Sequence, residues 1–143
     1  MLVVDCSVLM AWIAPDETSN YARNIQTTIM RHNIPIIVPP LFFLEVMNVL
    51  DVMQKRNRVN AEQAENAFLF LQKLPITVDN ESILLSSTLH VRQLMQQHGL
   101  TSYDASYIEV AKRRKISIST LDKALRKAAQ AENLFFAPPA IPW

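Results

Sequence analysis

The fold is decided by one stretch, Leu100-Thr-Ser-Tyr-Asp104-Ala-Ser-Tyr-Ile-Glu-Val-Ala-Lys-Arg-Arg-Lys-Ile-Ser-Ile-Ser-Thr120-Leu-Asp122. The hydroxyl of Thr101 or Ser102 can accept a hydrogen bond from a free backbone N–H and so begin a helix. Asp104 then falls in the first helical turn, where the helix dipole favours a negative charge. Residues 116–120 alternate apolar and polar side chains, which is typical of a short strand. The stretch therefore predicts a helix followed by a strand, with Asp122 just beyond the strand.

Asp104 lies at the edge of the helix face that we expect to pack inward. Tyr107, Ile108 and Ala111 follow it at the i+3, i+4 and i+7 positions, which share one face of a helix. A carboxylate beside a buried face is costly unless another group neutralises it. The carboxyl ends of strands are also where ligands bind in open α/β sheets. We therefore ask which other acids could join Asp104 and Asp122.

The rest of the chain alternates short apolar runs with helical patterns. We expect strands at residues 2–5, 34–38, 75–78 and 116–120, and helices at 19–31, 41–56, 60–74, 81–98 and 123–131. Asn60 and Gln63 form a capping box, and Gly99 is suited to end the helix before it. The apolar, proline-rich tail at 134–143 could form an edge strand, dock on the core or contact a partner. This order predicts an α/β fold with a mainly parallel sheet.

The helix expected at 41–56 is apolar almost all round. We expect it to be buried on more than one side, against the sheet and against another chain. Glu45, Asn48 and Asp51 form its one narrow polar line. For Asp51, a solvent-facing position is the simplest interpretation. Glu45 is flanked by large apolar residues, so both a solvent-facing and a functional position stay open for it.

Composition narrows the class of protein. The chain has 143 residues, of which 50% are hydrophobic and 19% are charged, so we expect one folded domain over residues 1–143. Its net charge of +1 means that nucleic-acid binding would need a local basic patch. The single Cys6 allows no internal disulfide, fits a cytoplasmic location and is expected to be a buried thiol. No membrane segment is expected, because prolines and Glu45 interrupt the apolar stretch at 34–50.

Three acids are expected to converge at one edge of the sheet. Parallel strands send their carboxyl ends to the same side, so Asp5 and Asp122 lie together and Asp104 lies beside them. Asp5 has a second interpretation as the N-cap of the following helix, with Ser7 sharing that role. Carboxylates that gather in this way repel one another unless cations lie between them, and Mg²⁺ and Mn²⁺ prefer such ligands. The hypothesis is metal-assisted phosphodiester hydrolysis.

Other kinds of site are excluded or disfavoured by the sequence. The three histidines have no zinc-site spacing with Cys6. One glycine cannot build a phosphate-binding P-loop or a dinucleotide fingerprint. A haloacid-dehalogenase-like phosphatase with Asp5 as nucleophile would typically carry a second Asp two residues later, where this chain has Ser7.

Four short motifs occur in the order that a known family uses. They are Val3-Val-Asp5-Cys-Ser7, Leu44-Glu45-Val-Met-Asn48-Val-Leu50, Tyr103-Asp104-Ala-Ser-Tyr107 and Ser119-Thr120-Leu-Asp122, and the run from Trp12 to Asp16-Glu17 is also typical. The chain thus resembles the PIN-domain family nearly end to end, and within it the VapC-type toxin ribonucleases of toxin–antitoxin pairs.

This resemblance implies a PIN-like three-layer sandwich and a specific set of functional residues. Asp5, Glu45, Asp104 and Asp122 would hold one or two Mg²⁺ or Mn²⁺ ions, supported by Ser7, Asn48 and Thr120. It also implies an RNA substrate, a homodimer and a small antitoxin that covers or enters the site. A non-catalytic PIN-like module that binds RNA or protein is the alternative.

Two groups of basic residues are candidates for RNA contacts. The run Lys112–Lys115 ends the Asp104 helix away from its acidic first turn, so we expect a solvated helix end that complements the dipole. Lys123, Arg126 and Lys127 lie nearer the acids and are better candidates for phosphate contacts. Arg126 could instead form a salt bridge with Asp122. Tyr103 and Tyr107 could stack on bases, although tyrosines at this spacing are more often part of a core.

Overall fold

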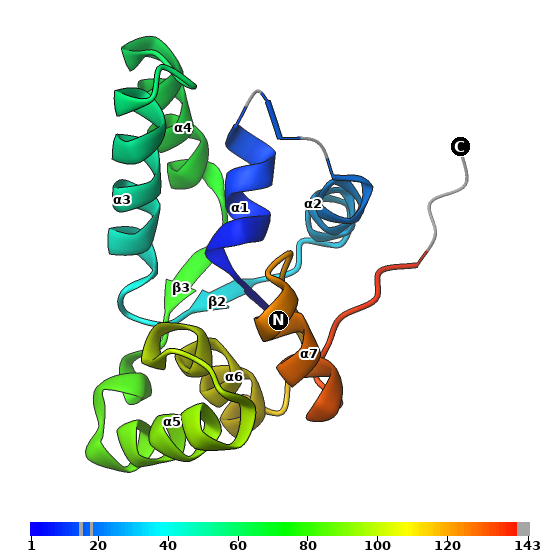
Figure 1. The fold of residues 1–143 in the computed structure, drawn as a ribbon. Coiled ribbons are helices and arrows are strands. Elements are labelled where there is room, and N and C mark those ends of the chain that lie inside the picture. Colours follow the sequence, from blue (N-terminus) through cyan, green and yellow to red (C-terminus); the bar gives the residue numbers. More distant parts are fainter. Residues whose placement is uncertain (15, 18, 140–143) are drawn as a thin grey trace.

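A four-stranded parallel sheet forms the centre of the protein, in the order β3–β2–β1–β4 (Figure 1). The computed structural model describes residues 1–14, 16–17 and 19–139. The strands are β1 (Leu2–Val4), β2 (Ile36–Val38), β3 (Ile76–Val78) and β4 (Ile118–Ser119). The helices are α1 (Cys6–Ile13), α2 (Asn20–His32), α3 (Phe42–Lys55), α4 (Ala61–Lys73), α5 (Leu85–His98), α6 (Ser102–Arg114) and α7 (Lys123–Ala131), and η1 (Asn80–Ile83) is a 3₁₀ turn.

Helices cover both faces of this sheet, as expected for an α/β fold. Figure 1 shows α5 and α6 on one side of the strands and α1 to α4 on the other. The residues of β1 and β2 are buried on both faces, which explains why their sequences are continuous apolar runs. The predicted three-layer architecture with a mainly parallel sheet is confirmed.

Parallel pairing brings the ends of β1 and β4 together. Val3 is in register with Ile118, and Val4 with Ser119. The backbone N–H of Asp5 donates to the carbonyl of Ser119 at 3.0 Å, one step beyond the strands. Asp5 and Thr120 therefore leave the sheet side by side, and this geometry positions the acids described below.

Most helix ends follow the chemistry of their capping residues. Thr101 accepts a hydrogen bond from the N–H of Asp104 and begins α6, and Asn60 and Gln63 form the predicted capping box of α4. Gly99 has a φ of 65° and ends α5, in the left-handed conformation that glycine adopts most readily. Tyr107, Ile108 and Ala111 are fully buried, so the predicted inward face of α6 is confirmed.

The single helix predicted at 81–98 is wrong at its start. The chain forms η1 and then extends at Leu84, with ψ of 146°, before α5 begins. As a result the side chains of Ile83, Leu84 and Leu85 are 71%, 51% and 74% exposed. Their apolar character suggested a buried helix face, but the turn directs them into solvent.

Within the single chain α3 is buried on one side only, and its expected burial against another chain stays a prediction. Only its stripe of Phe42, Val46, Leu50 and Met53 is buried. Exposed apolar side chains flank this stripe, namely Leu41, Phe43, Leu44, Met47, Val49 and Val52. Asp51 is exposed and pairs with Lys55 at 2.7 Å, as the solvent-facing interpretation predicts.

The described part of the C-terminal tail adds to the edge of the sheet. The N–H of Ile118 donates to Leu134, and the N–H of Phe136 donates to Ile118, each at 2.8 Å. Phe135 thereby forms an isolated parallel bridge with Ile118. The tail therefore pairs at the sheet edge around Phe135 and also packs against the core through Leu134, Phe135 and Phe136. Residues 140–143 lie outside the described residues. No helix in the described ranges is long and apolar enough to cross a membrane.

The basic run at the end of α6 is only partly the solvated helix end that we expected, because Lys112 and Lys115 are exposed but Arg113 and Arg114 are half-buried. Asp79, which follows β3, is fully buried and accepts hydrogen bonds from Arg113, Arg114 and Ser82. Arg113 also donates to Glu109 at 2.8 Å, and Lys112 pairs with Glu132 at 2.6 Å. The arginines therefore tie α6 to β3 and η1, because a buried carboxylate needs charged partners.

We expect Asp79→Asn to lower the free energy of unfolding by about 3 kcal/mol, because it removes one member of a buried ion-pair network. Burial alone would raise the pKa of Asp79, but hydrogen bonds from Arg113, Ser82 and Arg114 outweigh it and lower the pKa to about 2. The wild-type stabilisation should therefore be present above the unfolded pKa of about 4 and be lost as the pH falls through about 2. Urea unfolding across this pH range measures both effects. Glu81→Gln, whose pair with Arg113 is exposed, is the matched control and should change stability by less than about 1 kcal/mol.

Candidate metal-binding and catalytic site

All four predicted acids line one open cleft at the carboxyl edge of the sheet. Its volume is about 380 Å³. The lining residues are Asp5, Cys6, Ser7, Met10, Glu17, Glu45, Val49, Asp104, Leu121 and Asp122. They come from the end of β1, from α1 and the loop after it, from α3, from the first turn of α6 and from the segment after β4. The cleft therefore gathers acids that are up to 117 residues apart in sequence, the separation of Asp5 and Asp122.

Asp5 is the most buried of these acids, at 5% exposed. Its carboxylate accepts hydrogen bonds from the hydroxyls of Ser7 and Thr120, the latter at 2.8 Å. Burial raises its pKa, the two hydroxyls lower it, and the nearby charge of Asp104 raises it again, with a net rise. Asp5 does occupy the N-cap position of α1, but its side chain makes no capping hydrogen bond, so the interpretation of Asp5 as a side-chain cap is wrong.

Ser7 and Thr120 hold the two chain segments of the site together. The hydroxyl of Ser7 accepts from the N–H of Leu121 at 2.9 Å, and that of Thr120 accepts from the N–H of Asp122 at 3.0 Å. Thr120 is fully buried. Each hydroxyl therefore donates to Asp5 and also fixes the backbone after β4, which leaves the Asp5 carboxylate little freedom.

Glu45 faces the cleft and not open solvent. Burial and the charge of Asp5 raise the pKa of Glu45 to about 7, with a smaller contribution from Asp104. The hydroxyl of Tyr107 donates to Glu45 Oε1 at 3.3 Å and opposes this rise. Of the two interpretations left open, the structure favours a position in the site. Tyr107 is fully buried beneath it, which rules out base stacking for this tyrosine in this conformation.

Asp104 and Asp122 occupy the more open side of the cleft. Burial and the charge of Asp122 raise the pKa of Asp104. Asp122 is exposed, and its Oδ1 accepts a hydrogen bond from the N–H of Leu125 at 2.8 Å, so it caps α7. The alternative salt bridge with Arg126 is wrong, because the Arg126 guanidinium packs on Phe135 instead.

The donor chemistry of the cleft fits a hard divalent cation, since carboxylate oxygens are the ligands that Mg²⁺ and Mn²⁺ prefer. The rises in pKa of Asp5, Glu45 and Asp104 each include repulsion from another acid of the cleft, which a cation would relieve. The acids are not grouped closely enough to form a ready-made ion site. Over the described ranges, no group of three or more His, Cys, Asp or Glu side chains is arranged to hold a metal ion.

Asn48, predicted to support the site, lies beside it. Asn48 is exposed and lines an adjoining depression with Leu41, Leu44 and Tyr103, which shares Glu45 and Asp104 with the cleft. No hydrogen bond among the described residues joins its side chain to an acid. Its supporting role stays a prediction.

Glu17 is the cleft residue that sequence reasoning missed as a site residue. Arg58 holds its loop by two hydrogen bonds to Asp16, at 2.8 and 3.0 Å, and by one to Glu17 at 3.1 Å. The run Asp16-Glu17 was the only signal for this position. Cys6 is buried beneath the acids as predicted, and burial with the charges of Asp5, Glu45 and Glu17 raises its pKa to about 12, which makes it a poor nucleophile.

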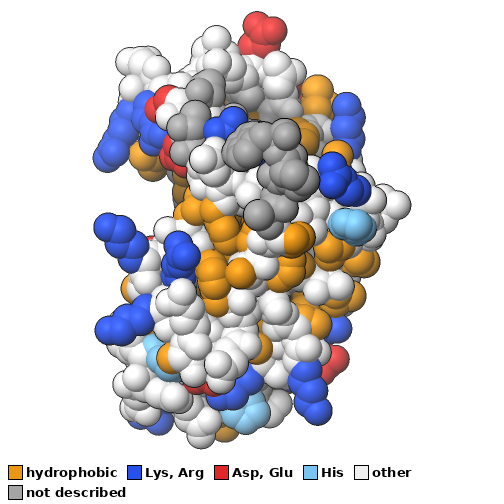
Figure 2. Space-filling view, turned by 90° about the vertical axis from the view of Figure 1, so that its right-hand side faces the viewer, with side chains coloured by type: hydrophobic (Ala, Val, Ile, Leu, Met, Phe, Trp, Pro, Cys, Tyr) orange, Lys and Arg blue, Asp and Glu red, His pale blue; other side chains and the backbone are white. Residues whose placement is uncertain are grey.

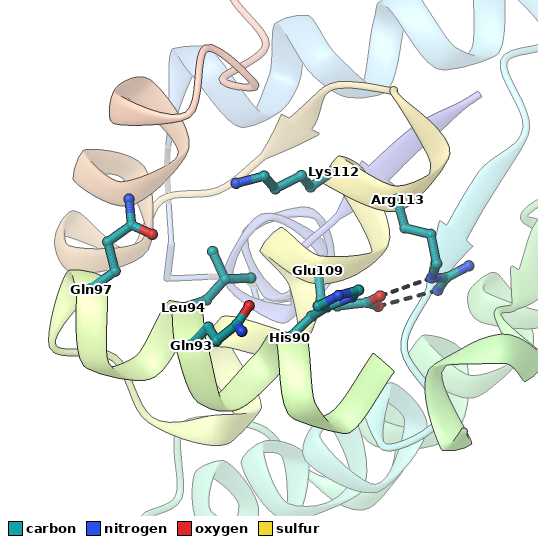
Figure 3. Close-up of a pocket in the computed structure, with 7 residues that line it drawn as sticks. All are labelled: His90, Gln93, Leu94, Gln97, Glu109, Lys112 and Arg113. Atoms are coloured by element: carbon teal, nitrogen blue, oxygen red, sulfur yellow. Dashed lines mark hydrogen bonds and ion pairs between the residues drawn. The ribbon is translucent and has the colours of Figure 1, made fainter. Parts of the chain in front are cut away.

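A second pocket, of about 330 Å³, lies between α5 and α6 away from these acids. It is lined by His90, Gln93, Leu94, Gln97, Glu109, Lys112 and Arg113, and Figure 3 shows the paired Glu109 and Arg113 in its wall. The charges of Glu109, Lys112 and Arg113 are all neutralised by partners within the protein. This pocket therefore lacks the unbalanced charge that marks the acidic cleft.

The chain matches a known protein family over most of its length. A family model described as the PIN domain matches residues 2–131. The chain belongs to the PIN-domain family. This confirms the family predicted from the four motifs. No curated protein sequence matches the chain.

Solved structures share this PIN fold at low sequence identity. PAE2754 from Pyrobaculum aerophilum is 24% identical, with a TM-score of 0.63 over 89% of this chain and 78% of that one. VapC20 from Mycobacterium tuberculosis, described as a toxin that cleaves the sarcin–ricin loop, is 14% identical, with a TM-score of 0.66 over 97% and 100%. A toxin–antitoxin complex from Klebsiella pneumoniae is 14% identical, with a TM-score of 0.63 over 99% and 100%.

We expect Glu45→Gln to stabilise the metal-free PIN domain at pH 8. The pKa of Glu45 is raised to about 7 in the folded state, so the folded protein binds this proton more tightly than the unfolded chain does. The resulting stabilisation is fully present below the unfolded pKa of 4.5 and is lost as the pH rises through 7. The glutamine carries no charge at pH 8, so the variant does not lose this stability. Its Tm at pH 8 should rise by about 2–4 °C, which corresponds to about 1 kcal/mol in a domain of this size. Thermal unfolding in EDTA at pH 5 and pH 8 measures the difference.

Asp51→Asn on the same helix is the matched control, because that acid is exposed and paired with Lys55. It should leave the difference between the two pH values unchanged. A Glu45→Gln variant that loses stability equally at both pH values would contradict the proposed electrostatic origin.

Proposed function

We propose that this PIN domain is a divalent-metal-dependent endoribonuclease and the toxin of a toxin–antitoxin pair. The observation that carries the proposal is the single cleft lined by Asp5, Glu45, Asp104 and Asp122, with Asp5 held rigidly at its base. RNA is the proposed substrate, and hydrolysis of its phosphodiester bonds is the proposed reaction.

The four acids have distinct tasks in this proposal. Asp5 is the fixed ligand, since Ser7 and Thr120 orient it before any ion binds. Glu45 and Asp104 complete the ligand set from α3 and α6, and Asp122 contributes from the start of α7. Bound Mg²⁺ or Mn²⁺ would supply an activated water and stabilise charge on the attacked phosphate. Without a cation the acids would repel the phosphate of the substrate, so the bound ion must also neutralise their charge.

The toxin assignment is supported by the similar structures. Their descriptions name a toxin that cleaves the sarcin–ricin loop and a toxin–antitoxin complex. We propose that this chain also binds a small antitoxin, which covers or enters the cleft. The depression formed by Leu41, Leu44 and Tyr103 offers that partner an apolar surface beside Glu45 and Asp104.

A homodimer is proposed from the exposed apolar surface of α3 and η1. Leu41 and Ile83 line the same shallow pocket, so the exposed apolar side chains of α3 and those of η1 form one continuous surface. Exposed apolar surfaces of this kind are typical of interaction sites. The alternative function is a non-catalytic PIN-like module that binds RNA or protein, which would need the fold but not the set of four acids.

We expect purified protein freed of antitoxin to cleave a total RNA pool into discrete products with Mg²⁺ or Mn²⁺ and not with EDTA. Asp5→Asn and Asp104→Asn should reduce the rate by at least about 100-fold, because each removes a ligand of the ion. Gel or sequencing analysis of the products measures cleavage. Both variants should stay folded, since each removes a repelling charge.

Asp51→Asn serves as the control for charge removal outside the cleft and should cleave at the wild-type rate. If Asp5→Asn and Asp104→Asn also cleave at that rate, the acidic site is not the catalytic site. A folded wild-type protein that binds RNA without metal-dependent cleavage would favour the binding module.

We expect the wild-type protein to sediment as a dimer, and the double variant Leu44→Glu, Met47→Glu to sediment as a monomer. The substitutions place charge on the exposed apolar side of α3, where burial in an interface would be costly. Analytical ultracentrifugation measures the change. Met30→Glu, an exposed methionine on α2, is the control and should remain dimeric; a monomeric wild type would refute the interface.

A further inference from the structure

Helix α7 carries positive charge that no acid within the helix balances. Lys123, Arg126 and Lys127 are exposed and occupy i, i+3 and i+4 positions, which place them on one face of the helix. The sequence of α7 contains no acid. Among the described residues, none of these three side chains takes part in an ion pair, in contrast to Lys112, Arg113 and Arg114. The net charge of the whole chain is only +1, so this helix is a local basic surface.

Arg126 is held in place by aromatic rings. Its guanidinium carbon lies 4.6 Å from the centre of the Phe135 ring and 5.9 Å from that of Tyr21. The two rings stack with their centres 5.5 Å apart. The hydroxyl of Tyr21 donates to the carbonyl of Phe136 at 2.8 Å and so fixes the tail beneath the arginine. A guanidinium held through its face keeps its N–H edges available for a phosphate.

This surface begins at the rim of the acidic cleft. Asp122 lines the cleft and caps α7, and Arg126 follows about one helical turn later, about 6 Å along the helix axis. Figure 2 shows the side of the molecule to which α2, α7 and the tail belong, with hydrophobic side chains across its middle and Lys and Arg side chains on both margins, including above and below a recess at the left. Charge and aromatic surface therefore occur together beside the proposed catalytic site.

We infer that Lys123, Arg126 and Lys127, together with the stacked Tyr21 and Phe135, form a binding track for single-stranded RNA that leads out of the cleft. The cations would contact successive phosphates, and the aromatic pair with the guanidinium would stack against an unpaired base. A duplex keeps its bases stacked inside, so it cannot use this surface equally. The inference rests on the proposed function, which supplies RNA as the substrate.

The ring of Phe135 reaches the track from the C-terminal tail. The family match ends at residue 131, and Phe135 lies beyond it. Phe135 is held at the sheet edge by the bridge to Ile118, so the tail carries its ring to α2 and α7. Charge complementarity favours RNA as the occupant, since the acids of the cleft repel phosphate and the exposed cations of α7 beside them attract it.

The test is fluorescence anisotropy with a labelled, mixed-sequence single-stranded RNA, in an Asp5→Asn background that prevents cleavage. Arg126→Gln should weaken binding about tenfold and reduce the slope of log affinity against log salt by about 1, the effect of one lost phosphate contact. Lys73→Gln is the matched control, because this exposed lysine ends α4 next to the opposite edge of the sheet and should change neither value.

Two further variants separate stacking from charge. Arg126→Lys keeps the positive charge but loses the planar stack, so binding should weaken while the salt slope stays constant. Phe135→Leu should weaken binding in the same way, with circular dichroism to verify that the protein is folded. If folded Arg126→Gln and Phe135→Leu bind as tightly as the parent, the track is wrong. Equal affinity for a duplex of the same sequence would also overturn it.

The outcome is independent of the nuclease test. A protein that cleaves RNA while all track variants bind normally would refute the track alone. A protein that does not cleave, but binds RNA through Arg126 and Phe135, would support the track and refute the nuclease.

Discussion

The buried hydrogen bond from Thr120 to Asp5 is the interaction on which the site depends. It can form only because β1 and β4 are parallel neighbours in register, so that residues 115 positions apart leave the sheet together. A carboxylate that is 5% exposed is costly without partners, and the hydroxyls of Ser7 and Thr120 supply them. The same two hydroxyls accept from the backbone after β4, so the position of Asp122 follows from that of Asp5.

The protein uses its charged residues in two opposite ways. At Asp79, every charge is matched: two arginines converge on a buried carboxylate and join β3 to α6. At the cleft, acids are left without basic partners, and burial together with their mutual repulsion raises the pKa values of Asp5, Glu45 and Asp104. A fold that needed only stability would avoid the second arrangement, which is why unbalanced charge is the better indicator of function.

The sequence predicted what depends on neighbours along the chain. Caps at Thr101 and Asn60, the glycine ending α5 and the inward face of α6 all follow from local spacing, and the parallel topology then places Asp5 and Asp122 at one edge. Contacts between distant segments were not predictable in this way. Nothing near Arg113 in the sequence indicates Asp79, which is 34 residues away. The break at Leu84, the hydrogen bond from Tyr107 to Glu45 and the place of Glu17 in the cleft likewise depend on packing between elements.

The tail has a consequence for how other molecules can approach the sheet. Strand β4 has two residues and would otherwise present unpaired backbone groups at the edge. Both the N–H and the carbonyl of Ile118 are already bonded to Leu134 and Phe136. A strand from another chain therefore finds no partner at Ile118, and the sheet is closed to extension at this position. Recognition on this side of the molecule must proceed through side chains, which leaves the exposed surface of α7 to determine what is bound there.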